Sequence, residues 1–128
     1  MGRMSRDKGA RAERELAKIL TRYGIGCRRG QVFNKEPDIV GVDGIHVEVK
    51  RTEKPEFAAY MKQAAEASEK KKDGIPVVFW RPSRHPWTVS MRARDYLWMT
   101  AGMVSVDEGL LWMGLESWIQ VYKGWNKL

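Results

Sequence analysis

The sequence has a single cysteine, Cys27, among its 128 residues. An internal disulfide is therefore excluded, and so is a cysteine-rich zinc site. No run of about 18 apolar residues occurs, so we expect no membrane span and no membrane partner. The stretch MGRMSRDKGARAERE lacks the apolar core of a signal peptide, and we expect a cytoplasmic protein.

Negative charge is also scarce, since 16 Asp and Glu residues stand against 23 Lys and Arg residues, for a formal net charge of +7. This sign favours a polyanionic partner, most often nucleic acid. Hydrophobic residues make up 43% and charged residues 30%, the balance of a globular protein. We expect one domain over residues 1–128, with a core at about 6–100 and an aromatic-rich helical tail at about 101–128.

The hydrophobic periodicity predicts an α/β protein. Helices are expected over residues 8–23, over 56–72 and from about 93. Strands are expected over residues 25–30, 38–42, 45–51, 75–80 and 87–92. This order of elements indicates a central mixed β-sheet flanked by helices. The tail can continue as a helix with an apolar face made of Leu111, Trp112, Leu115, Ile119 and Tyr122.

The stretch PDIVGVDGIHVEVK, residues 37–50, reads as a hairpin that carries charged side chains. A two-residue loop would place Asp38 opposite Val49 on the core face, which is costly for an ionised carboxylate. A three-residue loop over 42–44, with Gly44 in the left-handed region, is the next common class. It places Asp38 opposite Glu48, and we predict this register.

Two facing carboxylates repel each other, and a divalent cation between Asp38 and Glu48 would remove the conflict. Lys50 lies on the same face of its strand and could orient or help to deprotonate a water. The pattern is what metal-assisted phosphodiester hydrolysis requires, although the same triplet also occurs on ordinary solvated strands. Glu13 borders the apolar stripe of the first helix. It is either a third carboxylate aimed at the site or a boundary residue paired with a Lys or Arg. Glu15 is expected to point away from the site, so that Glu15→Ala leaves DNA cleavage nearly unchanged.

KGARAERELAKIL followed by PDIVGVDGIHVEVK resembles the PD-(D/E)XK nucleases, and most of all the archaeal-type Holliday-junction resolvases and related phage-borne endonucleases. The resemblance covers about residues 6–92. It implies a restriction-endonuclease-like core and a homodimeric, metal-dependent, structure-selective DNA endonuclease that resolves four-way or other branched junctions. A phage-borne enzyme would act in the host cytoplasm.

The resemblance also implies roles for individual residues. The metal, Mg²⁺ or Mn²⁺, would be held by Asp38, Glu48 and the Val49 carbonyl, with Glu13 close by and Lys50 as the catalytic lysine. Gln63 would reach the site from the next helix, unless it is a solvated helix residue. DNA contacts are expected from Arg14, Arg28, Arg29, Gln31, Asn34, Lys35, Arg51, Lys54 and Lys62.

Two other functions remain compatible with these residues. One is a different nuclease on the same core, which nicks, repairs or packages DNA. The other is a DNA-binding module whose carboxylates are only surface charges. The intact set of Glu13, Asp38, Glu48 and Lys50 argues against the second.

Overall fold

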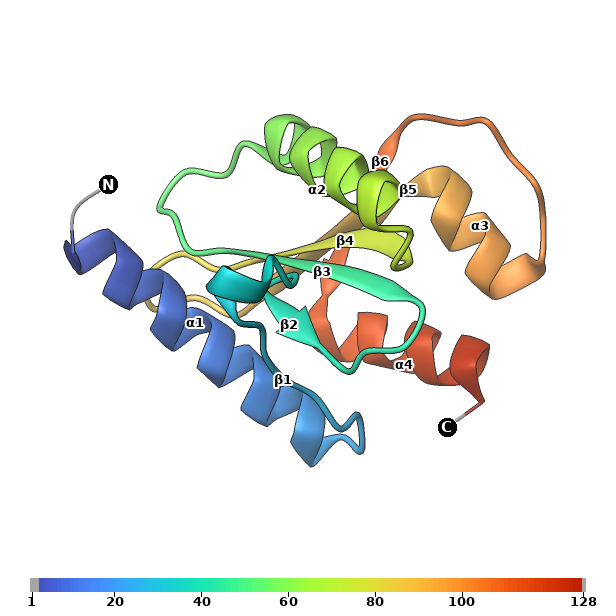
Figure 1. Ribbon diagram of the computed structural model, residues 1–128. Helices are drawn as coiled ribbons and strands as arrows, with labels where there is room; N and C mark the ends of the chain where they lie inside the picture. Colours follow the sequence, from blue (N-terminus) through green and yellow to red (C-terminus); the bar gives the residue numbers. More distant parts are fainter. Residues whose placement is uncertain (1–2, 128) are drawn as a thin grey trace.

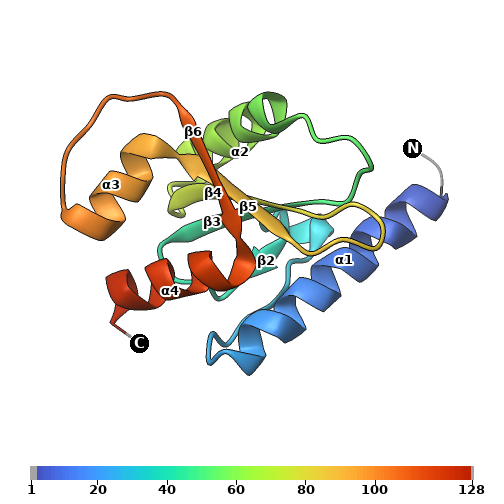
Figure 2. The same ribbon diagram turned by 180° about the vertical axis from the view of Figure 1, so that it is seen from behind.

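The computed structural model describes residues 3–127, which form a six-stranded mixed sheet with helices on both faces (Figures 1 and 2). The strand order is β1-β2-β3-β4-β5-β6, and β3 pairs in parallel with β4 while the other neighbours are antiparallel. The predicted α/β class with a central mixed sheet is confirmed. The elements are α1 Arg3–Arg22, β1 Arg28–Arg29, the 3₁₀ turn η1 Val32–Asn34, β2 Ile39–Val40, β3 Ile45–Lys50, α2 Phe57–Lys71, β4 Ile75–Trp80, β5 Thr88–Arg92, α3 Ala93–Ala101, β6 Leu110–Gly114 and α4 Leu115–Asn126.

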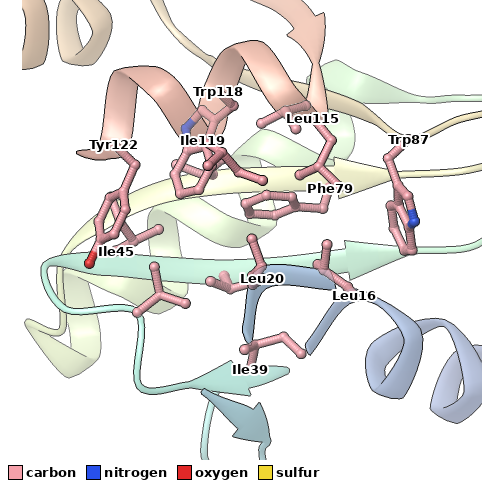
Figure 3. Close-up of a cluster of buried hydrophobic side chains, with 14 of the residues drawn as sticks. Leu16, Leu20, Ile39, Ile45, Phe79, Trp87, Leu115, Trp118, Ile119 and Tyr122 are labelled. Carbon is pink, nitrogen blue, oxygen red and sulfur yellow. The ribbon is translucent and has the colours of Figure 1, made fainter. Parts of the chain in front are cut away.

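The main core lies between one face of the sheet and helices α1 and α4 (Figure 3). Leu16 and Leu20 of α1 are fully buried there. From α4, Trp118 meets Phe79 of β4 edge-on at 5.0 Å between ring centroids and stacks on Tyr122 at 5.3 Å. The amphipathic spacing of α1 predicted its buried face correctly.

Helix α2 covers the opposite face of the sheet through a smaller cluster. Tyr60, Met61 and Ala64 pack against Val78 of β4. A parallel pair of strands needs a crossover connection, and α2 supplies it between β3 and β4. The face of β3 that carries Glu48 and Lys50 therefore lies on the α2 side, because alternate residues of a strand point to opposite faces.

Three segments that are distant in the sequence meet at the turn of the β2–β3 hairpin, namely the turn itself, α4 and the start of β4. Gly44 has a φ of +81°, as predicted for the three-residue loop. A side chain at Gly44 would strike the ring of Trp125 in α4, since an added Cβ would lie 2.7 Å from it. Tyr122 of the same helix donates its hydroxyl hydrogen to the Asp43 carbonyl at 3.0 Å, and the Ile75 amide donates to the Gly44 carbonyl at 2.9 Å.

Two predictions about the ends of the chain need correction. Helix α1 begins at Arg3 and not near residue 8. The tail is not one helix, because Leu110–Gly114 forms β6, which pairs with β5, and only Leu115–Asn126 is helical. Gly114 separates the two elements as the extended N-cap of α4. No helix in the described part of the chain is long and apolar enough to cross a membrane.

Candidate active site

Asp38 and Glu48 come together because of the hairpin register. Ile39 pairs with Val47, the register that the three-residue loop predicts. Asp38 precedes β2 by one residue, and its Oδ2 accepts the Val49 amide hydrogen across the hairpin at 2.7 Å. The predicted register is confirmed.

The Asp38 carboxyl has a pKa raised to about 7. Burial is the main cause, and the charges of Glu48 and Glu13 raise the pKa further, while the Val49 amide and the Lys50 ammonium lower it. The carboxyl thus lies among other carboxylates with too little positive charge to keep it ionised. A cation at this position would remove that penalty.

The raised pKa of Asp38 leads to a prediction about how the stability of the metal-free protein depends on pH. Between about pH 4 and pH 7 the folded state holds a proton on Asp38 that the unfolded state has lost, so stability falls as pH rises through that window. In EDTA, Asp38→Asn should therefore melt above the wild type at pH 8 by about 5 °C, and much closer to it at pH 4. Thermal melts at both pH values test this, with the exposed Asp7→Asn as control. A gain that is equal at both pH values would contradict it.

Lys50 is held by three neighbours. Its ammonium donates to Gln63 Oε1 at 2.9 Å, lies 3.6 Å from Glu48 Oε1 and sits over the ring of Tyr60, 5.3 Å from its centroid. The structure thus brings Gln63 to Lys50, where the resemblance placed it. Tyr60 was missed, although it lies one turn before Gln63 on the same face of α2.

Glu13 reaches toward the site from α1, and it is also paired. Its Oε1 accepts a hydrogen bond from Arg29 Nε at 2.6 Å, and its charge acts on Asp38. Both sequence-based alternatives for Glu13 therefore hold in part: it has an arginine partner and it borders the carboxylate pair. A role in metal binding stays a prediction.

Behind Glu48 lies a buried histidine, His46. His46 is 2% exposed, and its Nδ1 lies 2.8 Å from Asp73 Oδ2, while its Nε2 lies 3.7 Å from Glu48 Oε2. Burial lowers the pKa of His46, but Glu48 and Asp73 outweigh burial and raise the pKa overall. Asp73 gave no signal in the sequence, because 27 residues separate it from His46.

Glu15 does not point away, which corrects the prediction. It accepts two hydrogen bonds from Arg81 Nη1, at 2.9 and 2.7 Å, and one from the indole of the buried Trp87 at 3.1 Å. Arg81 follows β4 and Trp87 precedes β5. They lie 66 and 72 residues further along the sequence than Glu15.

Glu15→Ala should therefore destabilise the fold by about 1–2 kcal/mol, mostly because the Trp87 indole loses its acceptor. The half-exposed ion pair with Arg81 adds little. Urea unfolding measures the change, and Glu15→Gln, which keeps an acceptor, should lose less. If Glu15→Ala left the free energy of unfolding unchanged, the expectation that Glu15 points away would be restored.

The candidate DNA-binding residues fall into two groups. Three of them form ion pairs inside the chain, since Arg28 binds Glu36 at 3.0 Å, Arg29 binds Glu13 at 2.6 Å and Arg51 binds Glu53 at 3.2 Å. The others are exposed, on α1, on α2 or in the segments next to the β2–β3 hairpin, and their contacts with DNA stay a prediction. These are Arg14, Gln31, Asn34, Lys35, Lys54 and Lys62.

The carboxylate oxygens of Asp38 and Glu48 suit a metal ion that needs few protein ligands. Within residues 3–127, no group of three or more His, Cys, Asp or Glu side chains is arranged to hold a metal. Asp38 and Glu48 offer two carboxylates, which suits Mg²⁺, because that ion keeps several waters and takes phosphate oxygens as further ligands. Burial and the charge of Glu48 raise the pKa of Asp38, and a divalent cation between the two carboxylates would favour its ionised form.

The model of the archaeal Holliday junction resolvase (Hjc) family matches residues 4–118, and the chain belongs to this family. No curated protein matched the chain. Among solved structures, the chain is similar to Hjc, a Holliday junction resolvase from the archaeal hyperthermophile Archaeoglobus fulgidus. The TM-score is 0.47 at 22% identity, and the match covers 62% of this chain and 72% of that one.

Proposed function

We propose that this protein is a metal-dependent endonuclease that resolves four-way DNA junctions by hydrolysing phosphodiester bonds. The observation that carries the proposal is the gathering of Asp38, Glu48 and Lys50 at one hairpin in a chain of the Hjc family. Family membership supports junction cleavage over nicking, repair or packaging.

Asp38, Glu48 and the Val49 carbonyl would hold the divalent cation, which we propose to be Mg²⁺, with Mn²⁺ as a substitute. The bound cation would supply Lewis-acid polarisation of the phosphodiester and a more acidic water. Glu13 would help to retain the cation through its negative charge, while Arg29 keeps the Glu13 side chain in place.

Lys50 would supply the positive charge that steadies the phosphate and orients the attacking water. Its contacts with Gln63, Glu48 and Tyr60 fix the ammonium beside the carboxylate pair. Such preorganisation is what makes a charged group effective, because no reorganisation is needed when the reaction occurs.

A DNA-binding module without catalysis is less consistent with this geometry. Surface carboxylates that serve only solubility keep apart and stay ionised, whereas Asp38 is buried beside Glu48 at a cost to its own ionisation. Such a cost is typical of functional sites.

The deciding experiment compares cleavage of a four-way junction with cleavage of linear duplex, flap and single strand. We expect paired nicks at the junction with Mg²⁺ or Mn²⁺ and none with EDTA. Equal cleavage of all substrates would favour another nuclease, and no cleavage of any substrate would favour the binding module.

We further propose that the enzyme is a homodimer, so that two sites can cut two strands. Strand β6 is an edge of the sheet, and an exposed edge invites pairing with another chain. Exposed apolar side chains lie on β6, on α3 and in the segment that joins α3 to β6, and we call them the β6-edge patch: Trp98, Met103, Val104, Val106 and Trp112.

Sedimentation at micromolar concentration tests the dimer. Val104→Glu combined with Val106→Glu should yield a monomer, because both side chains are over 85% exposed and would bury a charge in the interface. Met4→Glu, at an equally exposed apolar site on α1, should leave the dimer intact. A wild type that sediments as a monomer with and without DNA would refute the proposal.

A further inference from the structure

The loop from Gln31 to Glu36 links β1 to β2. Its tip carries two exposed apolar side chains. Val32 is 80% exposed and Phe33 is 81% exposed, although both are large hydrophobic residues. Exposed apolar side chains are common singly, but two adjacent ones on a fixed turn mark a contact surface.

The Gln31–Glu36 loop is well braced by its own contacts. The Lys35 amide donates to the Val32 carbonyl at 3.0 Å, which closes the 3₁₀ turn. Glu36 accepts the Gln31 amide hydrogen at 2.9 Å and binds Arg28 through two nitrogens at 3.2 and 3.0 Å. A tip held this way presents its apolar side chains to solvent without loss of further backbone entropy on binding.

The Gln31–Glu36 loop stands beside the active site. At its base, the Gly30 amide donates to the carbonyl of Asp38 at 2.8 Å. On its other side, the Lys71 ammonium of α2 donates to the Lys35 carbonyl, and α2 is the helix that brings Gln63 to Lys50. Figure 1 shows η1 between α1 and α2 in front of β3. A DNA strand bound at Asp38 would pass this tip.

We propose that Phe33 stacks on an unstacked nucleobase at the branch point of the bound DNA, with Val32 packed beside it. Phe33 would then be a specificity-determining residue of the same site, so this inference rests on the proposed function. Aromatic faces stack on any base, and apolar wedges enter weakened base steps. Bases at a branch point have lost continuous stacking on one side and are cheaper to separate than bases within a duplex.

The surroundings of the tip favour DNA over a second copy of the chain. Cationic Lys35 and Lys71 lie beside it, next to the Arg28–Glu36 ion pair, so phosphate can bind next to the stacked base. The β6-edge patch lies at the opposite edge of the sheet, because β1 and β6 are its two outer strands. The tip is therefore separate from the surface proposed for dimerisation.

The test measures DNA binding in EDTA, where cleavage is not needed, with a four-way junction and with a linear duplex of the same arm sequence. Phe33→Ala should weaken junction binding by about 5- to 150-fold and leave duplex binding unchanged. Phe33→Tyr should restore junction binding, whereas Phe33→Leu should not, because it keeps the apolar surface but lacks a ring face. The matched control is Met4→Ala, at an equally exposed apolar site on α1.

A second readout places the fluorescent base 2-aminopurine at the branch point. The wild type and Phe33→Tyr should change its emission on binding, and Phe33→Ala should not. The inference is overturned if Phe33→Ala binds junctions like the wild type, if it loses junction and duplex binding equally, if Phe33→Leu restores binding as well as Phe33→Tyr, or if Phe33→Ala becomes a monomer where the wild type is a dimer. A wild type that binds junctions selectively but does not cut them with Mg²⁺ would sink the proposed function and leave this binding test valid.

Discussion

Junction cleavage is expected to fall by about 10³-fold or more when Asp38 is replaced by Asn, Glu48 by Gln or Lys50 by Ala. The first two changes each remove a negative ligand and, with it, most of the affinity for the cation. The third removes the ammonium that Gln63 and Tyr60 hold beside the carboxylates.

DNA binding should survive all three substitutions, because contacts between basic residues and phosphates supply most of it. It should tighten for Asp38→Asn and Glu48→Gln, because a negative charge leaves the surface that faces the DNA. Single-turnover cleavage beside a binding gel in EDTA separates the two effects. Asp43→Asn is the matched control, since it lies in the same hairpin but its side chain is exposed and only its carbonyl makes a hydrogen bond to α4. Cleavage by Asp38→Asn and Lys50→Ala at the wild-type rate would place the active site elsewhere.

Glu13→Gln extends this series to α1. If Glu13 acts on the metal, its loss should lower cleavage at low Mg²⁺ more than at saturating Mg²⁺, since only the affinity for the cation is reduced. Arg29 would lose its partner at the same time, so the thermal stability of the variant has to be measured alongside.

Trp118→Ala is expected to destabilise the protein by about 3–5 kcal/mol. The side chain is fully buried between Phe79 and Tyr122, and its removal would leave a large cavity between α4 and the sheet. Since domains of this size are stable by about 5–15 kcal/mol, the variant would lose much of its folded population on mild heating.

Urea unfolding of Trp118→Ala tests this expectation, and Trp118→Phe is the matched variant. Trp118→Phe should lose much less, because the ring stacking is retained and the indole N–H, which has no hydrogen-bond partner among residues 3–127, is removed. Trp112→Ala, at a half-exposed tryptophan on β6, should have a small effect on a monomer. A loss for Trp118→Ala below about 1 kcal/mol would mean that α4 packs only loosely.

The hairpin could be predicted from sequence because local rules decide it. An Asp-Gly turn, alternating apolar residues and the cost of burying Asp38 opposite Val49 leave one favourable register. The tail could not be predicted in the same way. Leu111, Trp112 and Leu115 fit a helix face, and the glycines at 109 and 114 only weaken that interpretation without showing where a strand should begin.

The missed contacts of Glu15 and His46 join distant parts of the chain. Glu15 finds Arg81 and Trp87 across the sheet, and His46 finds Asp73 after the α2 crossover. Such pairs depend on tertiary placement, and a single sequence offers no local signal for them. Glu13 was found because helical spacing and the family resemblance pointed to the same position, whereas Gln63 was found from the resemblance alone.

The contacts of Gly44 with Ile75 and Trp125 bear on when the enzyme becomes active during its synthesis. The hairpin that carries Asp38 and Glu48 has its turn packed under α4, with the Tyr122 hydroxyl bonded to the Asp43 carbonyl. On the ribosome the hairpin emerges long before α4 does, and such distant contacts form late. A nascent chain that ends before Leu115 would therefore expose the catalytic residues without fixing their geometry, and the capacity to cut DNA would arise only once α4 has left the exit tunnel.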